Sequence, residues 1–144
     1  MVLSAMFKVY LGIGNIALDM GYIAFAIALY EFNISGTVVG VIGCAIESIL
    51  FTANGFSISW VVANTIIGIC CGLVFRATDK LWIRIIAVLG SCILGLLVIK
   101  TAIECTLFSI PLAVKIPKNA VACAADAAVM LIGLWLAPKL HKKV

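Results

Sequence analysis

Apolar runs close to the length needed to cross a bilayer are the feature that most constrains how this chain folds. A membrane-spanning helix needs on the order of 20 mostly apolar residues. Charged or turn-forming residues divide the chain into five such runs. The first two runs are short for a membrane span, although the first could begin as early as Tyr10. The runs cover residues 19–30, 37–51, 57–75, 81–108 and 118–137. The sequence therefore predicts an all-α polytopic membrane helix bundle of about five spans, in one transmembrane domain over residues 1–144.

The composition excludes a water-soluble fold. Of the 144 residues, 65% are hydrophobic and only 11% are charged, and the mean hydropathy is +1.29. A chain this short has a large surface for its volume, so a soluble core cannot take up so much apolar surface, whereas a bilayer accepts it. We expect a multi-pass protein of a cell membrane.

Several function classes are also disfavoured. The net charge is +4, but the basic residues gather at the ends of apolar runs and form no stripe for nucleic acid. All six cysteines lie inside apolar runs without CxxC spacing, and the one histidine, His141, lies near the terminus, so we expect no metal site. No nucleophile with a base and no cofactor motif is visible, so we expect neither an enzyme nor a bound cofactor.

The distribution of lysine and arginine predicts the orientation. Basic residues favour the cytoplasmic side of a membrane when they flank short loops. The segment 76–84 and the tail 139–143 are both basic, which places them in the cytoplasm and the N-terminus outside. Lys115 and Lys118 lie in an outer loop against this rule, which invites a functional interpretation.

Six polar residues interrupt the predicted spans. An ionisable residue at bilayer depth costs roughly 2.5–3.5 kcal/mol on insertion scales, so each normally has a partner or a purpose. With the orientation above, all six fall in the outer half of the membrane, which predicts an outward-facing polar pocket. These residues are Asp19, Glu47, Asn64, Lys100, Glu104 and Asp126.

Each of these residues also has a structural alternative. Asp19 has the position of a helix cap, and Lys100 and Glu104 are spaced to neutralise each other as an (i, i+4) pair. Asp126 lies among alanines, where helices approach closely and a side chain can bond across the contact. Glu47 has no local partner and is the strongest site candidate.

One helical face of the third run combines polar and small residues. Trp60, Asn64, Gly68 and Gly72 follow each other at intervals of four. The glycines are typical of close helix packing in lipid, and Trp60 is equally an interfacial anchor. Asn64 would point into the same interior, where its amide could contact a solute.

Four segments resemble the substrate-binding S components of energy-coupling factor (ECF) transporters. Residues 55–76 resemble the outer loop and fourth span of that family, and residues 36–43 resemble its glycine-rich third span. Residues 100–104 and 118–119 resemble parts of its last two spans. The resemblance covers about residues 11–139.

The resemblance implies a six-helix protein of the bacterial plasma membrane that binds a vitamin or related heterocyclic micronutrient under its outer loops, here about residues 9–18, 52–57 and 109–117. It adds Asn15, Trp60, Lys115 and Asn119 to the expected substrate-binding residues. It also implies a transmembrane coupling (T) subunit and two cytoplasmic ATPase subunits as partners. The family's first helix, which packs on the coupling subunit, has no counterpart here, so we expect a truncated chain, a misassigned start or a member with only five spans.

The sequence thus favours a membrane subunit that binds a small solute for uptake. The excess of acidic residues in the spans favours a solute with amino or ring N–H donors, whereas Lys115 and Lys118 favour a carboxylate or phosphate; both remain open. The alternative is a stand-alone proton- or cation-coupled carrier in which Glu47 and Asp126 exchange protons, which would need polar groups near both membrane faces. A purely structural subunit would need no polar cluster at one depth.

Overall fold

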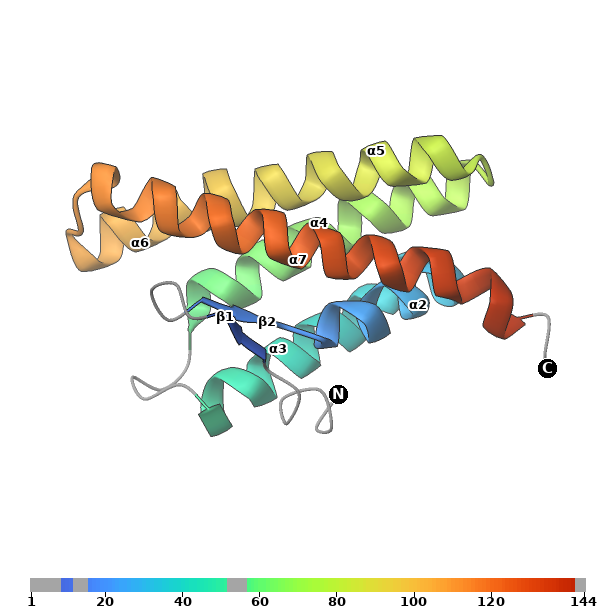
Figure 1. Cartoon of the computed structure of the whole chain (residues 1–144), viewed down its shortest axis with the longest axis horizontal. Coiled ribbons are helices and arrows are strands. Elements are labelled where there is room, and N and C mark those ends of the chain that lie inside the picture. Colours follow the sequence, from blue (N-terminus) through green and yellow to red (C-terminus); the bar gives the residue numbers. More distant parts are fainter. Residues whose placement is uncertain (1–8, 12–15, 52–56, 142–144) are drawn as a thin grey trace.

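The computed structural model describes residues 9–11, 16–51 and 57–141 of the chain. Side chains are described from Asp19 onward, apart from those of Glu47, Ser48, Leu50, Phe51 and His141. Helices account for most of this part of the chain, so the predicted all-α bundle is confirmed (Figure 1). In chain order the elements are β1 (Val9–Leu11), β2 (Ile16–Leu18), α2 (Gly21–Phe32), η1 (Asn33–Gly36), α3 (Thr37–Phe51), α4 (Ile58–Ala77), α5 (Leu81–Cys92), η2 (Ile93–Ile99), α6 (Lys100–Phe108) and α7 (Leu112–His141).

The first apolar run does not begin as a helix at Tyr10. Strands β1 and β2 form an antiparallel pair in which Tyr10 lies opposite Ala17, and α2 starts only at Gly21. The backbone of Asp19 then accepts the first turn's hydrogen bond from the N–H of Tyr22, at 3.2 Å. Residues 9–11 and 16–18 are therefore extended.

All five expected helical segments are present, but they supply four candidate membrane spans, not about five. By length and composition the spans are Gly21–Ile46, Ile58–Ala77, Leu81–Phe108 and Leu112–Leu140. The first combines α2, η1 and α3, and the chain reverses within it at Asn33, whose φ is 52°. Gly40 consequently packs against Phe25. With 12 and 15 residues, α2 and α3 are each shorter than a full span.

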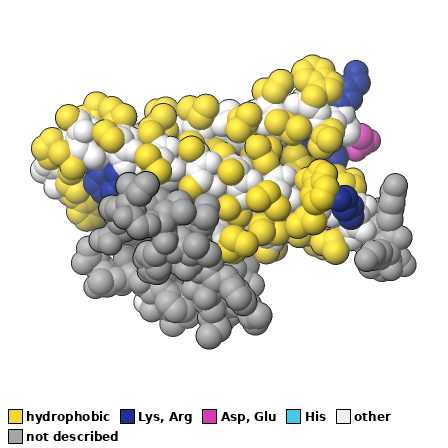
Figure 2. Space-filling model, viewed as in Figure 1, with side chains coloured by type: hydrophobic (Ala, Val, Ile, Leu, Met, Phe, Trp, Pro, Cys, Tyr) yellow, Lys and Arg dark blue, Asp and Glu magenta, His cyan; other side chains and the backbone are white. Residues whose placement is uncertain are grey.

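The long helices lie side by side along the length of the molecule, with the α2–α3 hairpin packed on α4 and α7 (Figure 1). One end holds the start of α4 and the turn at Ser109; we refer to it as the outer end. The other holds η1, the turn 78–80 and the end of α7, and we refer to it as the basic end. Hydrophobic side chains cover the visible helix surfaces, and Lys and Arg lie toward the two ends (Figure 2). This is the surface of a membrane protein.

Glycines let the α2–α3 hairpin approach α4, as the spacing of Gly68 and Gly72 predicted. A Cβ added at Gly72 would lie 2.7 Å from the Cα of Ile34, and one at Gly68 would collide with the side chain of Thr37. Close backbone contact of this kind replaces the hydrophobic driving force that is absent between helices in lipid. The packing role of these two glycines is confirmed.

Arg84 is buried, although the sequence placed it in an exposed basic segment. Its Nε donates to the carbonyl of Thr78 at 2.9 Å, and its Nη2 donates to the carbonyl of Phe75 at 3.1 Å and to Asp79 Oδ1 at 2.7 Å. The guanidinium carbon also lies 4.9 Å from the ring centroid of Tyr30 and 5.2 Å from that of Phe75. Arg84 thereby joins α2, α4 and α5 and fills the interior at the basic end.

Candidate functional site

Glu104 is the centre of a polar cluster between α4, α6 and α7 near the outer end. Its Oε2 forms an ion pair with Lys115 Nζ at 2.9 Å and accepts a hydrogen bond from Asn119 Nδ2 at 3.2 Å. Asn119 also donates to Thr101 Oγ1 at 2.9 Å, and Ser59 Oγ donates to Glu104 Oε1 at 3.4 Å. We call these five residues the Glu104 cluster. Both carboxylate oxygens are engaged, and Lys115 neutralises the charge.

The expected (i, i+4) ion pair between Lys100 and Glu104 is not formed, because Lys115 occupies the carboxylate. Lys100 Nζ lies instead 5.8 Å from the ring centroid of Trp60, within the range of a cation–π contact. Lys100 still interacts electrostatically with Glu104 and Asp126. Trp60 Nε1 in turn donates to Tyr22 Oη at 3.3 Å, so the polar network extends from α6 to α2.

A helical irregularity explains why Glu104 faces inward. Segment η2 is a π-helix, whose hydrogen bonds span five residues instead of four. The buried face passes from Leu96 to Thr101 and then to Glu104, so its first step is five residues. Continued α-helical spacing from Leu96 would have made Lys100 and Ile103, which are half-buried here, the fully buried positions in place of Thr101 and Glu104. The wide turn therefore sets which polar residues enter the bundle.

A hollow lies next to this network, between α2, α3 and α4. Its unfilled space is about 220 Å³ and partly open, and the centre of a water molecule has about 10 Å³ in which to move, which is room for roughly one water. It is lined by Asp19, Gly21, Tyr22, Phe25, Gly40, Cys44 and Asn64. Two of the residues predicted from the sequence, Asp19 and Asn64, thus share one cavity.

The side chain of Asn64, a residue that lines this hollow, is fixed by two hydrogen bonds. Its Nδ2 donates to Cys44 Sγ at 3.1 Å and to the carbonyl of Trp60 at 3.0 Å, which uses both amide N–H bonds. Asn64 is only 3% exposed, and its Oδ1 accepts no hydrogen bond from residues that the structure describes. The donors fix the amide and leave Oδ1 without a partner among the described residues.

Asp19 and Asp126 are both buried beside this region. Asp19 Oδ1 accepts a hydrogen bond from the backbone N–H of Gly21 at 2.8 Å, so Asp19 caps α2 while it lines the hollow. Asp126, on α7, interacts electrostatically with Tyr22 and Lys100. It therefore belongs to the network without lining the hollow.

Two expected site residues cannot be placed. Asn15 lies outside the described residues, and so does the side chain of Glu47, whose backbone belongs to α3. Sequence reasoning in turn missed Ser59, Thr101, Tyr22 and Cys44. The sequence spacing could have identified Tyr22, because it follows Asp19 by three residues and so lies on the same side of the chain where the helix begins.

Comparisons with family models, curated proteins and solved structures found no match. Within the described part of the chain, no group of three or more His, Cys, Asp or Glu residues could hold a metal ion. The described side chains of the site offer hydrogen bonds, charge and aromatic rings.

Proposed function

We propose that this membrane protein binds a small polar solute in the hollow between α2, α3 and α4, as the substrate-binding subunit of an ECF-type importer for a vitamin or related heterocycle. The observation that carries the proposal is Asn64 Oδ1, an acceptor held in place beside Asp19 inside a lipid-embedded bundle. A buried polar group in lipid is expensive and normally functional. A coupling subunit, two ATPases and a bacterial plasma membrane belong to the same proposal.

The polar groups favour a solute that donates hydrogen bonds. The hollow offers the carboxylate of Asp19 and the amide oxygen of Asn64, both acceptors. Lys115 is already paired with Glu104, which weakens the case for a carboxylate or phosphate. The buried network thus suits amino or ring N–H groups.

The hollow is nearly filled in this conformation. Sites for drug-sized ligands usually measure about 300–1,000 Å³, whereas this hollow has room for roughly one water molecule. Gly40 and Phe25 hold α3 against α2 at its border. A heterocycle would enter when the α2–α3 hairpin moves away from α4.

The first experiment measures thermal stabilisation of the purified protein by a panel of vitamins and precursors, because a ligand that binds only the folded state raises its apparent stability. The Asn64→Leu variant keeps the side-chain volume and removes the amide. It should weaken binding of the ligand found by at least about tenfold, or 1.4 kcal/mol. Thr65→Val is the matched control, because Thr65 Oγ1 bonds the carbonyl of Val61 in its own helix. A panel without any stabilising compound would contradict the proposal.

A stand-alone proton- or cation-coupled carrier is the second candidate. It is favoured by the polar groups at both ends of the bundle, since Arg84 and Asp79 lie at the basic end and Glu104 near the outer end. Uptake by liposomes containing only this chain, driven by an imposed proton or cation gradient, would support the carrier. Binding without uptake would support the importer subunit.

A further inference from the structure

Three basic residues at the basic end are exposed and unlike the buried Arg84. They are Arg76 near the end of α4, Lys80 just before α5 and Lys139 near the end of α7. We call them the basic collar. They come from separate segments of the chain, and the fold brings them to the same end of the bundle.

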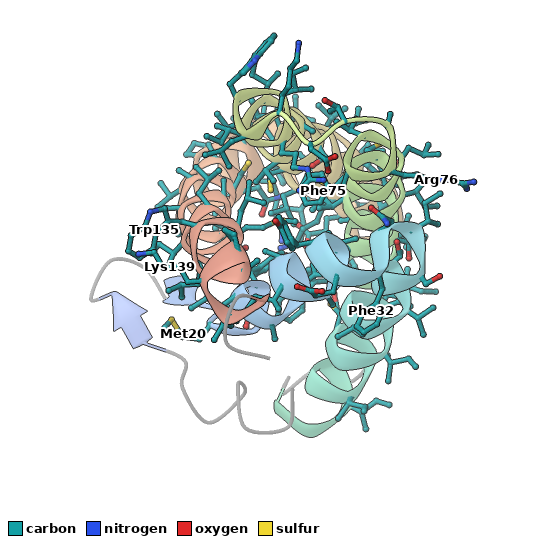
Figure 3. All side chains as sticks on the ribbon, turned by 90° about the vertical axis from the view of Figure 1, so that its right-hand side faces the viewer. Met20, Phe32, Phe75, Arg76, Trp135 and Lys139 are labelled. Atoms are coloured by element: carbon teal, nitrogen blue, oxygen red, sulfur yellow. The ribbon has the colours of Figure 1, made fainter. Side chains whose placement is uncertain are left out.

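The collar charges point outward around the end of the bundle. A view onto the basic end shows Arg76 and Lys139 extending on opposite sides of the helices (Figure 3). Arg84 is buried between α2, α4 and α5, and its guanidinium already binds Asp79 and two carbonyls. A partner attracted by the collar therefore surrounds the helices and does not sit on the middle of the end face.

Two tryptophans accompany the collar. Trp82 is 61% exposed and follows Lys80 by two residues, and Trp135 is 57% exposed with Lys139 Nζ 3.0 Å from its ring centroid. Tryptophan is enriched where acyl chains meet headgroups, because its ring is apolar and its N–H is polar. The tryptophans therefore place the collar at headgroup depth.

From this arrangement we infer that the basic collar binds the headgroups of anionic phospholipids. The negative groups nearby are few: Asp79 is engaged with Arg84, and Glu31 is exposed near the end of α2. Basic residues close to an anionic membrane surface are each attracted by it, and the attraction falls off over the screening length of the salt. Exposed apolar residues one or two turns inward, such as Leu73 and Ile132, offer the surface on which the acyl chains lie.

The outer end of the bundle carries an exposed lysine that serves as a control for the basic collar. Its Lys115 is paired with Glu104, and Lys118 is an exposed lysine on the first turns of α7. Substitution of Lys118 removes the same charge from the chain as substitution of Lys139, but at the opposite end.

The test compares thermal unfolding in nanodiscs of phosphatidylcholine alone with unfolding in nanodiscs that also contain phosphatidylglycerol. Phosphatidylglycerol should raise the unfolding temperature of the native chain, and high salt should reduce the increase. The triple variant Arg76→Gln, Lys80→Gln, Lys139→Gln should lose most of the increase, with each removed charge weakening lipid binding about fivefold. Lys118→Gln should keep it.

Unfolding in phosphatidylcholine alone checks that the triple variant is still folded, and native mass spectrometry counts the phosphatidylglycerol molecules that remain bound after extraction. The inference is overturned if phosphatidylglycerol does not stabilise the native chain, or if the triple variant retains both the stabilisation and the bound lipid. It is also overturned if soluble glycerol phosphate gives the same stabilisation, since the collar would then bind a free phosphate.

Discussion

At the scale of single residues, the ion pair of Glu104 and Lys115 organises the polar interior. The side chains of Lys115 and Glu104 are only 18% and 11% exposed, and their charged atoms lie 2.9 Å apart. Removing one partner of such a pair leaves a charge that neither water nor protein compensates, whereas removing both can be nearly neutral. The stability of the outer half of the bundle should therefore depend on the pair more than on either charge.

Lys115→Met should lower the free energy of unfolding by about 3 kcal/mol, because it leaves the Glu104 carboxylate without its counter-charge. The double variant Lys115→Met, Glu104→Gln should recover part of this loss. Denaturant unfolding in detergent measures both, and Lys118→Met is the control at an exposed lysine. Equal effects of Lys115→Met and Lys118→Met would show that the pair contributes no stability.

The sequence could identify the conspicuous members of this interior but not the inconspicuous ones. Asn64, Lys100, Glu104 and Asn119 stand out because amides and charges are rare in apolar runs. Ser59 and Thr101 do not, because hydroxyl side chains in helices commonly bond their own backbone, as Thr106 does to Ala102. Which lysine would pair with Glu104 depended on a contact between α6 and α7 that no local spacing encodes.

At the scale of elements, several helix boundaries were predictable, but the start of α7 and the helix irregularities were not. The expectation of an outer loop over residues 109–117 is wrong, because α7 begins at Leu112 and continues through Pro117, so Lys115 lies on a helix. The expected runs 37–51 and 81–108 coincide with α3 and with the continuous segment α5–η2–α6, because charges and turn formers mark their ends. The sequence features that mark the chain reversal at Asn33 and the π-helix η2 are weaker than those that mark the helix ends. Asparagine tolerates positive φ, but nothing in the apolar run 93–99 distinguishes a π-helix from an α-helix.

Gly72→Ala should destabilise the protein by about 1–3 kcal/mol, because its methyl group would overlap the backbone of Ile34, which cannot rotate away. Gly90→Ala is the matched control in another candidate span, since a Cβ there meets nothing within 4 Å. It should be neutral or stabilise by up to about 1 kcal/mol through helix propensity. Thermal unfolding in detergent compares the two, and equal outcomes would contradict the close α4–η1 contact.

Deletion of Val98 should be tolerated, although it removes a residue from the middle of a membrane helix. It leaves Leu96 and Thr101 at α-helical spacing, so η2 becomes regular and Glu104 still faces Lys115. Deletion of Leu89 from the regular helix α5 should instead rotate one side of the span by about 100° and abolish folding. Detergent size-exclusion profiles would distinguish them, and similar damage from both deletions would argue against the role assigned to η2.

At the scale of the whole molecule, the structure groups the chain turns as the charge pattern predicted. The turn at Ser109 lies at the outer end with the start of α4, and the turn 78–80 lies at the basic end with the end of α7 (Figure 1). The basic collar then predicts that the basic end faces the cytoplasm, because lysine and arginine in short turns favour that side.

Two matched variants, each with one exposed alanine replaced by cysteine, test this orientation. Ala113→Cys lies in the first turn of α7 and Ala77→Cys at the end of α4, and both positions are exposed. A membrane-impermeant maleimide applied to intact cells should label Ala113→Cys and should label Ala77→Cys only after the membrane is permeabilised. The unsubstituted chain gives the background from its six cysteines. Labelling in the reverse order would mean that the basic end faces outward.

The two-stranded ladder of β1 and β2 restricts what can surround it. In the described part of the chain each strand pairs only with the other, so one edge of each carries backbone groups that need another partner. Acyl chains offer none, and an open-edged ladder is tolerated only against water or protein. Asp19 directly follows β2. Water or protein, and not acyl chains, must therefore line these edges, and the Asp19 carboxylate lies at the end of the strand that carries one of them.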